Sequence, residues 1–309
     1  MAVNATAQQS GTGKRALVTG VSGFTGVYVV DALQRAGYRV FGMVGAGQPC
    51  GPDQHAVDLC DAQAVAAVVA QVLPDVVVHL AAISFVAHAD IDVIYRVNIG
   101  GTRNLLAALA ASPHRCSRVL LASSANIYGN ADVGLIGETQ PAAPANDYAV
   151  SKLAMEYMAS LWMDRLPIII VRPFNYTGVG QDERFLLPKM VGHFRRRSPT
   201  IELGRLAIAR DFSDVRTVAA SYRGLLEAGQ PGEAYNICSG HSVSLEAALD
   251  MLAEIAGYRI EVQVNPAFVR ANDVISLAGS NAKLNAAIGH VAHIAPIPLA
   301  DTLRWMYEA

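Results

Sequence analysis

The stretch "RALVTGVSGFTG", residues 15–26, joins a short apolar strand to a glycine-rich turn. Its glycines, Gly20, Gly23 and Gly26, have the spacing G-x-x-G-x-x-G, and a helical stretch over 24–36 follows. Glycine lets the backbone turn tightly and approach a pyrophosphate, which the N–H groups at a helix N-terminus then bind. Because the turn follows the first strand and opens the first helix, it predicts a site for NAD or NADP rather than a tight turn alone.

Apolar strands alternate with helical stretches along the first half of the chain. Strands are expected at 38–44, around Val57, and at 75–81, 118–124 and 167–172, and helices at 61–72, 90–111 and 147–163. Continuous apolar strands that alternate with helices indicate a parallel sheet covered on both faces. The predicted fold is therefore α/β, a Rossmann-type doubly wound sheet with a smaller C-terminal substrate-binding lobe.

The composition allows two lobes and excludes several classes of partner. The chain has 309 residues, is 52% apolar and 16% charged, and carries a formal net charge of −2. This balance does not favour nucleic-acid binding or a basic membrane patch. No apolar run reaches transmembrane length, and no secretory signal is recognised, so a cytoplasmic location is expected.

The cysteines and the domain boundaries follow from the same pass along the chain. Cys50, Cys60, Cys116 and Cys238 have no metal-ligand spacing, so buried free thiols and no metal site are expected. The expected domains are a flexible tail over 1–13, an NAD(P)-binding domain over 14–172 and a lobe over 173–309 that mainly binds the substrate. Segments near 212–240 are expected to return to the NAD(P)-binding domain.

The end of the second strand leaves the choice between NAD and NADP open. An acid there would accept hydrogen bonds from the NAD ribose, and an arginine would favour the NADP phosphate. The chain has Val44, Gly45 and Ala46 at this point. Asp58, after the third strand, is a candidate for contact with the adenine end of the cofactor or an ordinary surface or capping residue.

Three residues form a candidate catalytic set. Tyr148 and Lys152 are four apart at the start of a predicted helix, so both project from one face. A nearby ammonium and the helix N-terminus would stabilise a phenolate and lower the pKa of Tyr148. Ser124, at the end of a predicted strand, would hydrogen-bond the substrate oxygen and orient it for proton transfer.

With these motifs the chain resembles the extended short-chain dehydrogenase/reductases that modify nucleotide sugars. The matching stretches are "TGVSGFTG", "HLAA" at 79–82, "NIGGTRNLL" from Asn98, "SSANIYG" with Ser124 and "YAVSK" with Tyr148. The resemblance implies that Ser124, Tyr148 and Lys152 are catalytic and that the helices beginning near 90 and 147 form a homodimer interface. The cofactor-binding residues that it implies are Gly20, Gly23, Phe24, Thr25, Gly26, Asp58, Leu59, Ala81, Ala82, Asn98, Tyr148 and Lys152.

The second half of the chain is similar to the family's nucleotide-sugar segment. Arginine suits a diphosphate because its planar donors can bind in a bidentate manner. Two departures occur: Ala271 replaces a proline that is common in the family, and Tyr176–Thr177 stand where a histidine usually follows the asparagine. The substrate-binding residues that the resemblance implies are Ser84, Asn175, Lys189, Arg210, Arg270 and Asp273. His88 is a further candidate for sugar contact or for loop packing.

The resemblance implies reduction of the C4 keto group of a GDP-4-keto-6-deoxy-hexose by NADPH or NADH, giving GDP-D-rhamnose. A talose-forming or heptose relative, and a 4-epimerase with tightly bound NAD, are the alternatives. A 4,6-dehydratase is disfavoured because dehydratases of the family have an acid pair after the hydroxyl residue, where Ala125 and Asn126 stand here. A dinucleotide-sensing protein without catalysis is the alternative outside the enzymes, and the Ser-Tyr-Lys set argues against it.

Overall fold

The computed structural model describes residues 11–84, 90–131, 134–266, 276–291 and 294–309. The chain divides into two compact units, and each unit contains separate stretches of sequence. The first unit comprises Met1–Ala122, Ala154–Ile170 and Tyr222–Glu233. The second unit comprises Ser123–Leu153, Val171–Ser221 and Ala234–Ala309. Helix α7 (Val215–Ala228) therefore contributes to both units.

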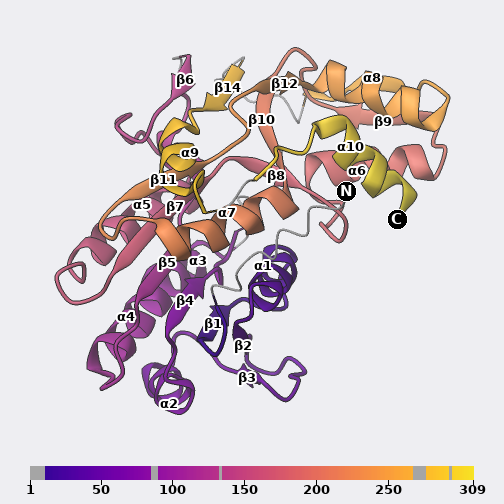
Figure 1. Cartoon of the computed structure of the whole chain (residues 1–309). Coiled ribbons are helices and arrows are strands. Elements are labelled where there is room, and N and C mark those ends of the chain that lie inside the picture. The colour runs from indigo at the N-terminus through magenta and orange to yellow at the C-terminus, as the bar shows by residue number, and fades with distance from the viewer. Residues whose placement is uncertain (1–10, 85–89, 132–133, 267–275, 292–293) are drawn as a thin grey trace, which may run out of the picture. The chain divides into compact units, whose positions relative to one another are not determined.

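A seven-stranded sheet has the order β11-β7-β5-β4-β1-β2-β3, the arrangement of a doubly wound α/β fold (Figure 1). Its strands are β1 (Arg15–Thr19), β2 (Arg39–Val44), β3 (Gln54–Ala56), β4 (Val76–His79), β5 (Arg118–Ala122), β7 (Ile168–Pro173) and β11 (Ala234–Ile237). The neighbouring pairs among β1 to β5 are parallel, and the interior residues of β1 and β4 are buried because both faces of the sheet are covered. The predicted fold class is confirmed.

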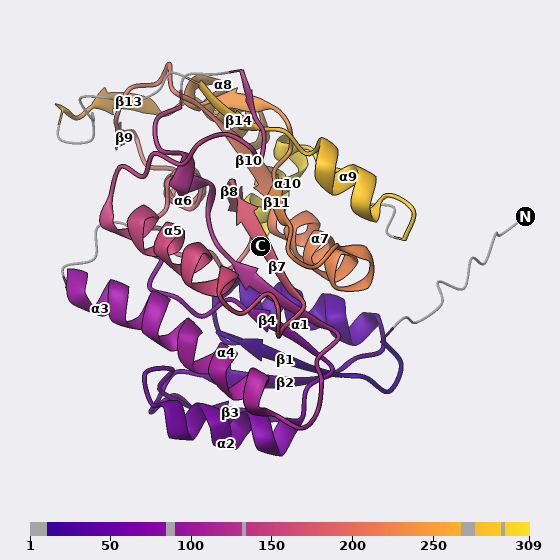
Figure 2. The ribbon, with the colours of Figure 1, turned by 90° about the vertical axis from the view of Figure 1, so that its left-hand side faces the viewer.

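The helices of the first half follow the expected alternation. They are α1 (Phe24–Arg35), α2 (Ala62–Val72), α3 (Ile91–Tyr95), a π-helical turn (Arg96–Gly101), α4 (Thr102–Ala111) and α5 (Asp147–Ser160). Helices α3 and α4 lie end to end in Figure 2, so the helix expected over 90–111 is one rod with a π turn inside it. Helix α2 begins where the Asp61 side chain accepts from two backbone N–H groups, and it packs against α4.

The second unit has a sheet of its own. Strands β12 (Ser242–Ser244), β10 (Ala209–Asp214), β14 (Ser276–Gly279) and β6 (Leu135–Ile136) pair in that order, and β8 (Asn175–Thr177) also pairs with β10. Strands β9 (Thr200–Leu203) and β13 (Glu261–Val264) form a second small sheet. The remaining elements of this unit are a 3-10 turn (Ala125–Tyr128), α6 (Leu186–Arg195), α8 (Leu245–Ala256), α9 (Ala282–Ile288) and α10 (Leu299–Glu308). Apolar side chains of α6, α8 and α10 form its larger core.

The cysteines differ in part from the expectation. All four are free, but only Cys116 and Cys238 are buried, whereas Cys50 is exposed and Cys60 is half-buried. Cys50 lies in the short loop after β2, which contributes little to the core. In the described part of the chain no helix is long and apolar enough to span a membrane.

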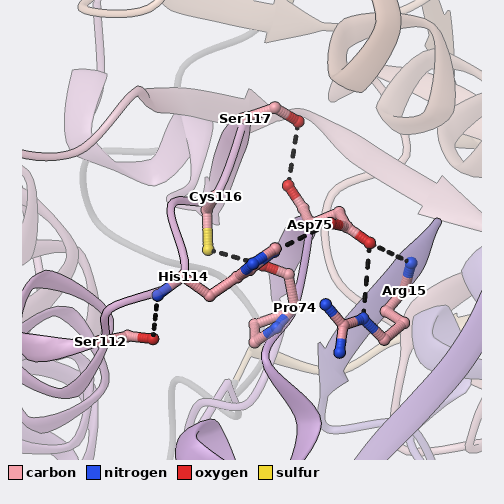
Figure 3. A network of polar contacts seen from close by, with 7 residues as sticks. All are labelled: Arg15, Pro74, Asp75, Ser112, His114, Cys116 and Ser117. Carbon is pink, nitrogen blue, oxygen red and sulfur yellow. Dashed lines mark hydrogen bonds and ion pairs between the residues drawn. The ribbon is translucent and has the colours of Figure 1, made fainter.

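Asp75 links the amino-terminal ends of the central strands (Figure 3). Its carboxylate accepts from the backbone N–H of Arg15 at 2.7 Å and contacts the His114 ring at 2.9 Å. Its carbonyl oxygen accepts from the N–H and the hydroxyl of Ser117. Burial opposes ionisation of Asp75, but the hydrogen bonds and charges of Arg15 and His114 outweigh it and hold the pKa of Asp75 below its ordinary value.

We expect Asp75→Asn to lower stability at neutral pH by about 1.5 to 3 kcal/mol, the range for hydrogen bonds to a charged group. A carboxylate with a depressed folded-state pKa stabilises the fold above its unfolded pKa, and this contribution is lost as the pH falls through the folded value. Urea unfolding should therefore show a gap between the variant and the unmodified protein that narrows on acidification. Asp31→Asn is the control, because the Asp31–Arg35 pair is exposed and should contribute less than about 1 kcal/mol. A gap that persists unchanged in acid would contradict the role of the Asp75 charge.

Candidate active site

The glycine turn of the first unit has the geometry of a pyrophosphate cradle. Gly20 has a φ of +70°, which L side chains rarely adopt, and a Cβ there would lie 2.9 Å from the backbone nitrogen of Ala81. A Cβ on Gly26 would collide with the carbonyl oxygens of Gly20 and Val21. Gly23 is the N-cap of α1, so the N-terminal turn of this helix begins directly after the glycine turn. These residues fit a dinucleotide phosphate group.

Other residues expected to contact the cofactor surround this turn or follow the neighbouring strands of the same unit. Asn98 is buried in the π-helical turn, where its amide accepts from the N–H of Ile83 at 2.9 Å and donates to the carbonyl of Ile83 at 3.2 Å. Asp58 is exposed and accepts from the N–H of Cys60 at 2.8 Å, as a capping residue does. The remaining candidates are Phe24 and Thr25 at the start of α1, the buried Leu59, and the half-buried Ala81 and Ala82.

The loop after β2 carries a contact that the sequence analysis missed. The Ser22 hydroxyl, inside the glycine turn, donates to the side-chain oxygen of Gln48 at 2.9 Å. Gln48 therefore stands next to the position at which an acidic residue would read the cofactor ribose. Gln48 could have been identified from the sequence, because the residues after the second strand determine the preference for NAD or NADP.

In the second unit the three expected catalytic residues come together. Ser124 is the N-cap of the 3-10 turn and accepts from the N–H of Asn126 at 3.1 Å. Its hydroxyl also hydrogen-bonds the Tyr148 phenol, and both side chains are buried. Lys152, one turn further along α5, has its ammonium 6.0 Å from the centre of the Tyr148 ring. A serine, a phenol and an ammonium are thus gathered at the start of one helix.

The titration of Tyr148 differs from the expectation. Burial raises the pKa of Tyr148 well above the ordinary value, and the hydrogen bond from Ser124 lowers it only in part. Tyr176 adds to the rise because a second phenolate nearby would repel the first. The expected lowering of this pKa is therefore wrong, since desolvation of the phenolate outweighs the favourable groups. A phenol with a raised pKa stays protonated at neutral pH and can serve as a proton donor.

A polar network supports the loop that carries Ser124. The Tyr128 hydroxyl donates to the Asn236 side chain at 2.8 Å and accepts from the Arg172 guanidinium at 2.9 Å. The Glu138 carboxylate accepts from the N–H of Asn236, and its carbonyl accepts from Arg172. This network ties the 3-10 turn to β7 and β11, so it fixes the backbone just after Ser124.

Ser123 differs from its neighbour. Its side chain is 3% exposed, and its hydroxyl has no hydrogen-bond partner among the described residues. Burial of a hydroxyl without a hydrogen-bond partner is unfavourable, so packing alone does not explain why residue 123 is a serine. The sequence analysis named only Ser124 as a site residue. Two adjacent serines at a strand end do not show which hydroxyl has a hydrogen-bond partner.

The expected substrate-binding residues lie on different elements. Asn175 is exposed on β8, and Arg210 is half-buried on β10, where its guanidinium donates to the carbonyl of Ala209 at 2.9 Å. Lys189 on α6 donates to the carbonyl of Glu202 at 2.8 Å. Ser84 is exposed after β4 in the first unit. Arg270, Asp273 and His88 lie outside the described residues.

A doubly wound sheet, a glycine turn before the first helix and a Ser-Tyr-Lys set define a dinucleotide-dependent enzyme of the α/β class. A model of the NAD dependent epimerase/dehydratase family matches residues 16–238, so the chain belongs to this family. The protein is accordingly an NAD(P)-dependent oxidoreductase. When bound, the dinucleotide supplies or accepts a hydride at its nicotinamide ring. The glycine turn is the part of this chain that fits the phosphates of the dinucleotide.

Relatives of known activity match nearly the whole chain. A GDP-6-deoxy-D-talose 4-dehydrogenase of Aggregatibacter actinomycetemcomitans is 34% identical over 89% of this chain and 91% of its own length. A GDP-6-deoxy-D-mannose reductase of Pseudomonas aeruginosa is 32% identical with the same two coverages. Both names describe redox enzymes that act on GDP-linked 6-deoxy sugars.

Solved structures give the same picture of the fold. An epimerase candidate from Burkholderia cenocepacia J2315 is 54% identical with a TM-score of 0.91, over 96% of this chain and 98% of that one. The structure of RMD from Pseudomonas aeruginosa complexed with NADPH is 30% identical with a TM-score of 0.82, over the same shares of the two chains.

Proposed function

We propose that the protein reduces the C4 keto group of a GDP-4-keto-6-deoxy-hexose, converting GDP-4-keto-6-deoxy-D-mannose to GDP-D-rhamnose with NADPH or NADH. The observation that carries the proposal is the contact between the Ser124 hydroxyl and the buried, protonated Tyr148 phenol, with Lys152 on the same helix face. The similarity to a reductase and a dehydrogenase of GDP-6-deoxy sugars supports the choice of substrate class.

In the proposed reaction the chain's own residues hold the carbonyl and deliver the proton. The Ser124 and Tyr148 hydroxyls donate to the C4 oxygen, which polarises the carbonyl and orients it. Tyr148 gives its proton to the C4 oxygen, while the new C4–H bond would take its hydride from a bound NADPH or NADH. The product is a secondary alcohol, and Lys152 favours the phenolate that remains because its charge is opposite.

The loop after Ser124 disfavours the dehydratase alternative. Elimination of water from the sugar needs a side chain that removes a proton and one that protonates the leaving hydroxyl. Ala125 and Asn126 follow Ser124, and neither side chain can act as an acid or a base at neutral pH. The site therefore supports hydride and proton transfer at C4 without dehydration.

A talose-forming reaction is the second candidate. It is favoured by the 34% identity with a GDP-6-deoxy-D-talose 4-dehydrogenase and by Tyr176 next to Tyr148, where relatives usually have a histidine. GDP-6-deoxy-D-talose and GDP-D-rhamnose differ only in the configuration at C4. The two reactions therefore use the same residues and differ in the face of the sugar that receives the hydride.

The decisive experiment incubates the purified protein with NADPH or NADH and GDP-4-keto-6-deoxy-D-mannose and identifies the product by NMR. We expect stoichiometric oxidation of the cofactor and a C4 alcohol, whose configuration separates the two candidates. The dTDP-linked 4-keto-6-deoxy sugar serves as the control for the nucleotide. Interconversion of GDP sugars without net cofactor oxidation would instead establish an epimerase, and tight cofactor binding without any turnover would establish a sensor.

We also propose that the protein is a homodimer that associates through α5. Val150 and Tyr157 lie seven residues apart on one side of α5, and Leu161 follows directly after its last residue. Tyr157 is 70% exposed and Leu161 is 79% exposed. Exposed apolar side chains aligned in this way indicate an interface. Because the family resemblance implies that the helix beginning near 147 is part of a dimer interface, a second copy of the chain is the expected partner.

Analytical ultracentrifugation tests the dimer. The unmodified protein should sediment as a dimer, and the double variant Tyr157→Glu with Leu161→Glu as a monomer, because two charges would be buried at the interface. Val264→Glu is the matched control, since Val264 is 57% exposed on β13, outside this helix face, and should leave the dimer intact. A monomeric unmodified protein would contradict the proposal.

A further inference from the structure

His79, the last residue of β4, is buried between two threonines of the first unit. Its side chain is 4% exposed, its Nδ1 lies 2.7 Å from the Thr19 hydroxyl and its Nε2 lies 2.8 Å from the Thr102 hydroxyl. Thr19 ends β1 directly opposite His79 in the parallel pairing, and Thr102 begins α4. The imidazole therefore bridges two strands and a helix, and the mechanism derived above does not use it.

The direction of each hydrogen bond follows from the donors at the helix side. The Thr102 hydroxyl lies 2.7 Å from the carbonyl oxygen of Asn98, which can only accept, so it spends its single hydrogen there. The Thr102 oxygen must then accept from His79, and this places a hydrogen on Nε2. In the neutral imidazole Nδ1 is accordingly the acceptor.

The hydrogen bonds of Thr19, at the end of β1, complete this series. The N–H of Ala81 donates to the Thr19 oxygen at 3.1 Å, so the Thr19 hydroxyl is free to give its hydrogen to Nδ1 of His79. The hydrogen bonds thus run in one direction from Ala81 through Thr19 to His79, and from His79 through Thr102 to Asn98. All of the hydroxyl and imidazole hydrogens in this chain have acceptors, as buried polar groups require.

Both ends of this series of hydrogen bonds lie at residues that are expected to bind the cofactor. Thr19 immediately precedes Gly20, whose positive φ brings its α-carbon so close to Ala81 that a side chain would not fit. Asn98 holds both polar groups of the Ile83 backbone through its amide. Through Thr19 and Thr102, the imidazole connects the glycine turn and the segment after β4 with the π-helical turn.

We propose that His79, as the Nε2–H tautomer, is a positioning residue of the dinucleotide site. It holds the Thr19 hydroxyl against Ala81 and thereby fixes the separation between the glycine turn and the segment that follows β4. Two substitutions separate the two hydrogen bonds of His79. In His79→Asn the side-chain oxygen can replace Nδ1, and in His79→Gln the side-chain nitrogen can replace Nε2–H. Neither side chain can contact both threonines.

The first test measures NADPH dissociation constants without substrate, so it does not depend on which sugar the enzyme reduces. We expect His79→Gln to weaken NADPH binding about tenfold, the effect of losing the buried hydrogen bond to Thr19. Thr19→Val should weaken it at least as much, because the Thr19 hydroxyl contacts both His79 and Ala81. His79→Asn and Thr19→Ser, which keep the hydrogen bond between positions 19 and 79, should bind within about threefold of the unmodified protein. Thermal unfolding midpoints of the same variants separate this effect from a general loss of stability.

The outcomes are distinct. If His79 is only a core residue, the Gln and Asn variants will lose stability together while their NADPH affinities stay equal, and the positioning role is refuted. The second test is ¹⁵N NMR of the unmodified protein, in which His79 should show a protonated Nε2 and an unprotonated Nδ1 at neutral pH. A hydrogen on Nδ1 would overturn the assignment even if some variants fail to fold.

Discussion

Tyr148→Phe is expected to reduce turnover by about 10²- to 10⁴-fold, the contribution of a positioned general acid. The substitution removes one hydroxyl and leaves the ring, so α5 and the packing around it should be retained. Without the phenol, no proton reaches the C4 oxygen as the new C4–H bond forms, and the Ser124 hydroxyl alone remains to stabilise the developing charge. The NADPH dissociation constant should change far less than turnover does, because the Lys152 ammonium is unchanged.

Tyr157→Phe is the matched control for this prediction. Tyr157 lies on the same helix but is 70% exposed, so removal of its hydroxyl should leave turnover unchanged. Steady-state kinetics and fluorescence titration of NADPH measure the two quantities separately. Equal turnover in the two variants would remove Tyr148 from the reaction, and with it the role proposed for the Ser124–Tyr148 contact.

The raised pKa of Tyr148 determines how turnover in the proposed reaction depends on pH. A donor whose pKa lies above the ordinary tyrosine value of about 10 stays protonated across the neutral and mildly alkaline range. Turnover in the reducing direction should therefore not fall in this range through loss of the Tyr148 proton. In the oxidising direction Tyr148 must act as a base, and the same raised pKa makes the phenolate scarce at neutral pH.

Local patterns predicted the first half of the fold well. Continuous apolar runs bounded by turn residues mark buried parallel strands, and β1, β2, β4, β5 and β7 begin and end within two residues of their expected bounds. The π-helical turn at 96–101 was not predicted, because the sequence analysis interpreted residues 90–111 as one regular helix. The adjacent glycines of "NIGG" were its only sign in the sequence.

Features that depend on burial or on distant contacts could not be read from sequence. The Tyr148–Lys152 spacing correctly placed the two side chains on one helix face, yet the pKa of Tyr148 is set by desolvation, which spacing does not reveal. Similarly, Asp75 and His114 are 39 residues apart and meet only because β4 and β5 are neighbours in the sheet. Sequence patterns identify candidate groups, whereas their protonation depends on the packing around them.

Gly26→Ala is expected to have the largest effect on cofactor binding. Its Cβ would meet the carbonyl oxygens of Gly20 and Val21, which are backbone atoms that cannot rotate away as a side-chain end could. The turn must therefore widen or α1 must shift, at a cost of about 1 to 3 kcal/mol for an overpacked buried site. Either movement displaces the N–H groups that bind the pyrophosphate, so we expect NADPH to bind at least tenfold more weakly.

A graded series tests whether this steric account is correct. A Cβ at Gly23 would lie 3.2 Å from the Gly20 oxygen, a contact that a small shift relieves, so Gly23→Ala should weaken binding less than Gly26→Ala. At Gly100 a Cβ would meet nothing within 4 Å, and Gly100→Ala should leave NADPH affinity unchanged and raise the unfolding midpoint slightly, since alanine is the better helix former. Isothermal titration with NADPH ranks the three variants. Any other order, above all a Gly26→Ala variant that binds like the unmodified protein, would mean that the turn does not need its close backbone approach to hold the cofactor.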